Sequence, residues 1–163
     1  MSEANGWMAP SAGQLQAVLR RTRTVAVLGA SPNPARPSNV AAAYLLAHTD
    51  WDVYFVNPNA TEILGRPVYR SPAELPVVPD LVDVFRRPAE LPHVLTETIK
   101  AGASTLWLQF GLYDAAIAEQ AEAAGLTVVM DRCLKIGHTR FAMADTPRTA
   151  DSPGGIPRSL GRR

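Results

Sequence analysis

The chain has 163 residues, a formal net charge of +1 at pH 7, and 47% apolar against 19% charged residues. This size and composition are typical of a single globular domain, and the small net charge favours no nucleic-acid partner. No apolar run approaches the ~18 residues of a membrane span, and the start lacks the pattern of a signal peptide. The chain has one cysteine and so cannot form an internal disulfide. We expect a cytoplasmic protein that contacts no membrane.

The two ends of the chain differ in composition from the middle. Residues 1–12 are mostly small or polar, and residues 145–163 contain three prolines, three glycines and four arginines. Such segments have too few apolar side chains to offset the entropy lost on ordering. We expect a flexible N-terminus over 1–12, one domain over 13–144 and a disordered tail over 145–163.

Within the domain, short apolar runs alternate with helical patterns. In chain order, the sequence predicts a helix over 14–21, a strand over 25–28, a helix over 39–48, a strand over 52–56, a turn over 63–69, a helical turn over 71–74, a strand over 81–85, a helix over 88–101, a strand over 105–109, a helix over 113–124, a strand over 126–130, and a short helix or turn over 134–141.

This alternation predicts an α/β fold with a five-stranded, mainly parallel sheet. Strands that are apolar throughout are typical of parallel sheets covered by helices on both faces. The expected architecture is a three-layer Rossmann-like fold, in which ligands bind beyond the carboxyl ends of the strands. Polar and conformationally special residues follow each of the five predicted strands, and these positions are the candidate binding site.

The first strand ends in a loop that departs from the dinucleotide fingerprint. That fingerprint is Gly-x-Gly-x-x-Gly, but after Gly29 the second and third glycine positions hold Ser31 and Pro34. Backbone N–H groups, the start of the next helix, the Ser31 hydroxyl and the Arg36 guanidinium could still bind a phosphate. The alternative is a rigid, proline-stiffened connector without a ligand.

The next two strand ends also allow two interpretations each. Asn57-Pro58 stands where an NAD site usually presents an acid to the ribose, so it could border a base or simply form an Asn-Pro turn. Phe85-Arg86 could wall a ligand channel and bind phosphate. Otherwise Phe85 is buried and the arginine is solvated.

The last two strand ends add an amide and a thiol. Gln109 can donate to and accept from an amide-bearing ligand, and Gly111 permits a close backbone approach. Arg132 is a charged neighbour of the Cys133 thiol, although a catalytic role for this thiol has little support. The three histidines are scattered and match no zinc spacing, so we expect no metal site and assign no catalytic residue.

Five motifs occur in an order that resembles the small bacterial CoA-binding proteins: VNP, EILG, VFRR, WLQ-x-G and V-x-DRC-x-K-I. Their domain is similar to the CoA-binding domain of the succinyl-CoA synthetase α subunit and of ADP-forming acyl-CoA synthetases. The resemblance covers about residues 14–142. It implies a Rossmann-like fold that binds coenzyme A through its ADP and phosphate portion.

The resemblance assigns each strand end a place along coenzyme A. The first loop would cradle phosphate, the second strand end would border the nucleotide, and the third and fourth would line the rest of the groove, with the fifth at its far edge. The implied binding residues are Gly29, Ala30, Ser31, Arg36, Pro37, Asn57, Pro58, Phe85, Arg86, Gln109, Gly111, Arg132 and Cys133.

Three functions remain open at this stage. The leading hypothesis is a stand-alone module that binds coenzyme A or an acyl-CoA without chemistry of its own, as a monomer or a homo-oligomer. The second is the CoA-binding subunit of a multi-component acyl-CoA ligase or transferase, because a domain of this length leaves no room for the phosphohistidine and nucleotide-grasping domains of the synthetases. An NAD(P)-binding domain is the weakest hypothesis, because the second and third glycines of the dinucleotide fingerprint and the acid after the second strand are missing.

Overall fold

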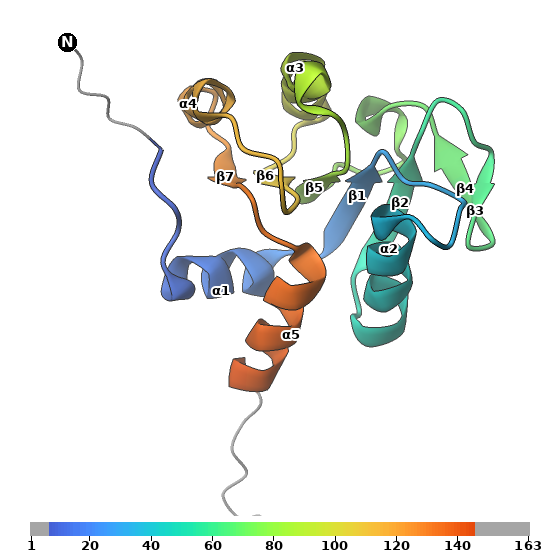
Figure 1. Ribbon diagram of the computed structural model, residues 1–163, viewed down its shortest axis with the longest axis horizontal. Helices are drawn as coiled ribbons and strands as arrows, with labels where there is room; N and C mark the ends of the chain where they lie inside the picture. The colour runs from blue at the N-terminus through green and yellow to red at the C-terminus, as the bar shows by residue number, and fades with distance from the viewer. Residues whose placement is uncertain (1–6, 146–163) are drawn as a thin grey trace, which may run out of the picture.

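The computed structural model describes residues 7–145, which form one seven-stranded sheet in the order β3-β4-β2-β1-β5-β6-β7 (Figure 1). Neighbouring strands are parallel except for the β3–β4 pair. The strands are β1 (Thr24–Leu28), β2 (Asp52–Val56), β3 (Glu62–Ile63), β4 (Arg66–Tyr69), β5 (Leu81–Val84), β6 (Thr105–Leu108) and β7 (Thr127–Val129).

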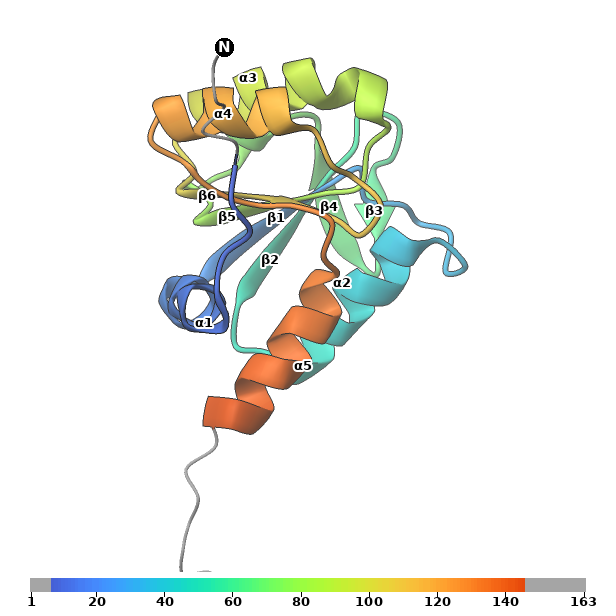
Figure 2. The same ribbon diagram turned by 60° about the vertical axis from the view of Figure 1, so that its left-hand side comes forward.

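Helices cover both faces of this sheet and give the expected three layers (Figure 2). One face carries α1 (Ala12–Arg21), α2 (Pro37–His48) and α5 (Leu134–Asp145), and the other carries α3 (Leu91–Ala101) and α4 (Ala115–Ala123). Two short 3₁₀ turns, η1 (Pro72–Glu74) and η2 (Pro88–Glu90), complete the described elements. The prediction of a Rossmann-like α/β fold is confirmed.

The predicted strand count of five was wrong, because the segment expected to be a turn is a β-hairpin. β3 and β4 pair in antiparallel register around Leu64 and Gly65, whose φ angles are 49° and 75°. Two successive positive φ angles are the mark of the type I′ turn that closes two-residue hairpins. β4 then pairs in parallel with β2 and extends the sheet by two strands.

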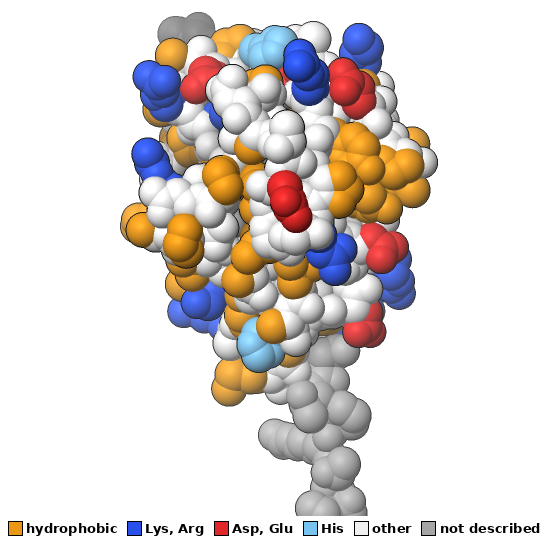
Figure 3. Space-filling view, turned by 90° about the vertical axis from the view of Figure 1, so that its right-hand side faces the viewer, with side chains coloured by type: hydrophobic (Ala, Val, Ile, Leu, Met, Phe, Trp, Pro, Cys, Tyr) orange, Lys and Arg blue, Asp and Glu red, His pale blue; other side chains and the backbone are white. Residues whose placement is uncertain are grey.

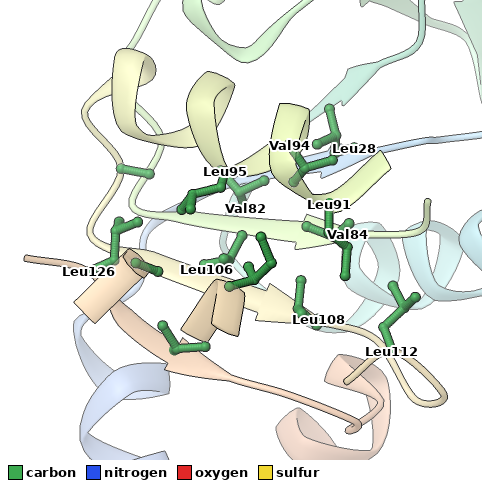
Figure 4. Packing of buried hydrophobic residues seen from close by; sticks show 14 of the residues in the cluster. Leu28, Val82, Val84, Leu91, Val94, Leu95, Leu106, Leu108, Leu112 and Leu126 are labelled. Carbon is green, nitrogen blue, oxygen red and sulfur yellow. The ribbon is translucent and has the colours of Figure 1, made fainter. Parts of the chain in front are cut away.

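The apolar strands are explained by the two hydrophobic cores that they separate. Alternate residues of a strand point to opposite faces, so Leu28 and Val84 pack under α3 and α4 (Figure 4). Val27 and Trp107 belong to the second core, under α1, α2 and α5. Because both faces of these strands are buried, neither face needs polar side chains.

Local sequence sets most helix ends, with small shifts from the predicted bounds. Ser11 and Gln14 form a reciprocal capping box that starts α1, as this pairing does generally. Asp114 caps α4 by accepting from the Ile117 N–H at 3.1 Å. The helix predicted to begin at Pro88 opens as η2 and becomes α-helical only at α3, and the last helix, α5, is 12 residues long rather than a short turn.

The segment before α1 runs along the β7 edge of the sheet. The Trp7 indole N–H donates to the Val128 carbonyl at 3.1 Å, and its ring meets Tyr113 edge-on. β7 is the last strand of the sheet, so this contact covers part of an otherwise unpaired edge. Of the predicted flexible ends, residues 1–6 and 146–163 lie outside the described residues.

Charged side chains are distributed over the surface without a band of one sign on the face that Figure 3 shows. Within residues 7–145, no helix is both long enough and apolar enough to cross a bilayer. The same residues hold no cluster of three or more His, Cys, Asp or Glu side chains placed to bind a metal ion.

Candidate functional site

The strand order places the candidate residues at one edge of the sheet. β1 lies between β2 and β5, so the chain leaves β1 in one direction and later returns to its other side. Such a switch point, at the carboxyl ends of parallel strands, is where open α/β sheets bind ligands. The loops after β1 and β5 meet there.

Gly29 allows these two loops to touch. Its φ is +89°, and a Cβ atom added to it would lie 2.2 Å from the Phe85 carbonyl oxygen and 2.9 Å from the carbonyl carbon. Its N–H donates to the Val56 carbonyl of β2 at 3.0 Å. The single glycine of the loop therefore serves close packing between the ends of β1, β2 and β5.

The loop between β1 and α2 is held by its own polar groups. The Ser31 hydroxyl accepts from the Asn33 N–H at 3.1 Å, and the Asn33 side chain accepts from the Ala35 N–H at 2.9 Å. The Asn39 amide of α2 donates to the Ser31 carbonyl at 2.9 Å. These backbone N–H groups are turned inward, so the loop offers fewer amides to a phosphate than a glycine-rich loop does.

Arg36 supplies the exposed positive charge of this loop. It is the N-cap residue of α2, its side chain makes no capping hydrogen bond, and it forms no ion pair with the described residues. Pro37 follows as the first residue of the helix. A guanidinium beside a helix N-terminus is a favourable place for an anion.

Asn57 and Pro58 form a turn, which is one of the two interpretations that the sequence allowed. The Asn57 amide donates to the Ala30 carbonyl at 2.7 Å and its oxygen accepts from the Asn59 N–H at 2.8 Å. Asn57 thus ties the β2 loop to the β1 loop. Both polar ends of its side chain are already used within the protein.

Phe85 and Arg86, which follow β5, have different surroundings. Phe85 is half-buried and packs against the core under α1, α2 and α5. Arg86 and the neighbouring Arg87 lie 3.5 and 3.6 Å from the two carboxylate oxygens of Glu90. Glu90 partly neutralises the charge of both arginines. The sequence analysis missed it, because the helical turn η2 is what brings Glu90 back to them.

The remaining predicted residues follow β6 and β7, which lie beyond β5 in the sheet order. Gln109 follows β6, while Arg132 and Cys133 link β7 to α5. The Trp107 indole N–H donates to the Arg132 carbonyl at 2.8 Å, and the Gly111 N–H donates to the Asp131 carboxylate at 2.7 Å. These bonds fasten the β6 and β7 loops to each other.

Gln109, Arg132 and Cys133 line an open groove of about 750 Å³, here called the α1–α5 groove. Its apolar walls come from Leu15 and Leu19 of α1, from Ile136 and Phe141 of α5, and from Trp107. The ten other predicted residues, Gly111 included, do not line it. This groove could not be predicted from the sequence, because only the folded chain brings α1 and α5 opposite each other.

A buried carboxyl lies in the strand between the two parts of the site. Asp83 of β5 is fully buried beside Val27 and Trp107 in the strand register, and neither carboxylate oxygen has a hydrogen-bond partner among residues 7–145. Burial raises the pKa of Asp83 well above its usual range. An acid inside an apolar strand was the sequence signal for this group, and it was overlooked.

One of the three histidines lies in a helix interface. His138 of α5 is buried, and its Nδ1 lies 2.9 Å from the Tyr44 hydroxyl of α2. Burial lowers the pKa of His138, and the charge of His48 lowers it further.

Comparison with known proteins gives a consistent family. The family described as "CoA binding domain" matches residues 23–139. The uncharacterized protein YneT of Bacillus subtilis is 33% identical over 129 residues, which cover 79% of this chain and 95% of YneT.

A ligase and a solved structure are also similar. The ADP-forming acetate–CoA ligase I of Archaeoglobus fulgidus is 30% identical over 145 residues, or 82% of this chain, but these cover only 21% of the ligase. A hypothetical protein from Pyrococcus horikoshii OT3 aligns with a TM-score of 0.78 and 35% identity, over 86% of this chain and 99% of that chain.

Proposed function

This chain belongs to the CoA-binding domain family, and we propose that it binds coenzyme A or an acyl-CoA at the carboxyl edge of its sheet, as a stand-alone cytoplasmic module without complete catalytic machinery. The observation that carries the proposal is the family match over residues 23–139, which includes all of the candidate residues. Two similar proteins, YneT and the Pyrococcus horikoshii protein, are matched over 95% and 99% of their lengths, which supports a module that works alone.

The proposed site matches the chemistry of coenzyme A in two places. Its phosphates need positive charge, and Arg36 offers an exposed guanidinium that forms no ion pair with the described residues, at the start of a 12-residue helix. Arg86 is a weaker phosphate partner because Glu90 lies 3.5 Å away. The amide-bearing pantetheine arm needs amide partners, which Gln109 provides.

NAD(P) fits the same edge less well. Dinucleotide sites use an acid after the second strand to bind the ribose hydroxyls. Here Asn57 takes that position, and both ends of its amide are bound to Ala30 and Asn59. We therefore propose coenzyme A in preference to a nicotinamide cofactor.

A role as the CoA-binding subunit of a ligase is the second candidate. It is favoured by the 30% identity to a ligase of which this chain spans about one fifth. In that case the acyl-phosphate chemistry would reside on a partner subunit. Nucleotide hydrolysis that requires both coenzyme A and a co-purifying partner would distinguish this candidate from the stand-alone module.

The proposal is tested by calorimetric titration of coenzyme A into the full chain. We expect Arg36→Gln to weaken binding by about 1–3 kcal/mol, or at least about fivefold in Kd, because a charge-assisted phosphate contact is lost. Arg66→Gln is the matched control, since Arg66 is also exposed but begins β4, about 10 Å from the carboxyl end of that strand. Equal affinities for the two variants would remove Arg36 from the site, and NADH binding in competition with coenzyme A would contradict the choice of ligand.

A further inference from the structure

The α1–α5 groove holds a polar group that the protein leaves without a partner. Gln109 is 9% exposed, it lines the groove, and its Oε1 atom is buried without a hydrogen bond from the described residues. Leaving such an acceptor unpaired costs free energy that a bound donor would recover. A 180° turn of the carboxamide exchanges its oxygen and nitrogen, so the group can either donate to or accept from a ligand amide.

Most of the walls beyond Gln109 are apolar, although Gln16, Arg132 and Arg140 also line the groove. Leu15 and Leu19 face Ile136 and Phe141 across the groove, and Ile136 is 51% exposed although it is aliphatic. The volume of about 750 Å³ lies in the range of small-molecule sites. Asp131, the one acid in the lining, already accepts from the Gly111 N–H. This chemistry suits an amide followed by a hydrocarbon chain.

The groove continues the candidate site across the sheet. Gln109 is bonded through its N–H to the Val84 carbonyl of β5 at 3.3 Å, and the Phe85 N–H is bonded to the Leu28 carbonyl of β1 at 2.8 Å. The two strand spacings between β1 and β6 amount to about 10 Å. A ligand with its phosphates at Arg36 can therefore extend an amide-containing arm past Phe85 to Gln109.

We infer that the α1–α5 groove binds the acyl chain of an acyl-CoA thioester, with Gln109 hydrogen-bonded to the last amide of the pantetheine arm. The inference rests on the proposed function and deepens it, because it makes an acyl-CoA with an apolar chain the preferred ligand over free coenzyme A. The apolar groove then determines the acyl-chain length that the protein selects.

The experiment compares the Kd of coenzyme A, acetyl-CoA and hexanoyl-CoA for the full chain by calorimetric titration. Each buried methylene is expected to tighten binding by about fourfold, so hexanoyl-CoA should bind at least about tenfold more tightly than acetyl-CoA even with partial burial. Ile136→Glu places a charge in the groove and should bring the ratio of the acetyl-CoA Kd to the hexanoyl-CoA Kd down to about one.

Ile99→Glu is the matched control. Ile99 is 43% exposed on α3, on the opposite face of the sheet, and it does not line the groove. This variant should keep the full preference for hexanoyl-CoA. As a second readout, hexanoyl-CoA should slow maleimide modification of Cys133, which lines the groove and is the only cysteine of the chain.

Each outcome decides a different claim. If coenzyme A binds but the affinity does not rise with chain length, the acyl groove is wrong and the proposed function stands. If the gain persists in Ile136→Glu, the acyl chain lies elsewhere and the inference is overturned. If neither coenzyme A nor its thioesters bind, both the inference and the proposed function fail.

Discussion

Gly29 gives the sharpest test of how the candidate site is built. In Gly29→Ala the new Cβ would lie 2.2 Å from the Phe85 carbonyl oxygen, and the residue would keep a φ of +89°. The left-handed backbone costs about 1–2 kcal/mol for a residue with a Cβ. Because the obstructing atoms belong to backbone, the β5 loop must also move, at a further cost of about 1–3 kcal/mol. We expect a total loss of roughly 2–5 kcal/mol in the free energy of unfolding.

Urea unfolding of the variant, followed by fluorescence, measures this loss. Gly125→Ala is the control, because Gly125 has a φ of +94° but, apart from its two chain neighbours, no described residue has an atom within 4 Å of its added Cβ. The control should show the backbone cost alone, so the difference between the two variants isolates the contact with Phe85. Equal losses in both variants would refute the claim that Gly29 is required for the approach of the β1 and β5 loops.

Three further predictions concern stability. Burial raises the pKa of Asp83, so the wild type should lose stability as pH rises above about 3.9, by at most about 1.4 kcal/mol per pH unit. Asp83→Asn should remove this dependence of stability on pH. Parallel stability–pH profiles for wild type and variant would contradict the prediction. Burial and His48 lower the pKa of His138, so stability should be lost as pH falls below about 6.5; His138→Gln should flatten this decline in urea unfolding, and an unchanged decline would argue against it. Trp7→Ala removes the hydrogen bond to Val128 and should cost about 1–2 kcal/mol; amide exchange in β7 should accelerate, and unaltered exchange would show that the edge needs no cover.

Much of the fold follows from the sequence because its strands are buried on both faces. The five apolar runs became β1, β2, β5, β6 and β7, and no end differs from its predicted bound by more than one residue. Their apolar character is set by burial alone, which a single sequence displays directly. Helix ends were predictable where a local group determines them, as Gly102 does with its left-handed φ of 81° at the end of α3.

The β3–β4 hairpin was not predictable on the same grounds. Its strands have two and four residues, Pro67 lies within β4, and Leu64 adopts a positive φ that this residue rarely takes. The hairpin is stabilised by pairing of β4 with β2. Such tertiary pairing overrides local propensity and leaves little trace in the segment itself.

The sequence predicted that the candidate site lies at the strand ends, but it did not predict how the site residues are arranged in space. Strand order brings Gly29 to Phe85 and places β5 between Gly29 and Gln109. The internal bonds of Asn57 and the ion pair of Arg86 with Glu90 depend on loop conformation. For the same reason the α1–α5 groove, which joins residues more than 100 positions apart, has no signature in the sequence.

Native mass spectrometry of the full chain with coenzyme A is the decisive test of coenzyme A binding. We expect a complex of one coenzyme A per chain, which forms at micromolar to low-millimolar ligand and is not displaced by an excess of NADH. A spectrum that shows only the free protein with millimolar coenzyme A and with its acyl thioesters would contradict the proposed function.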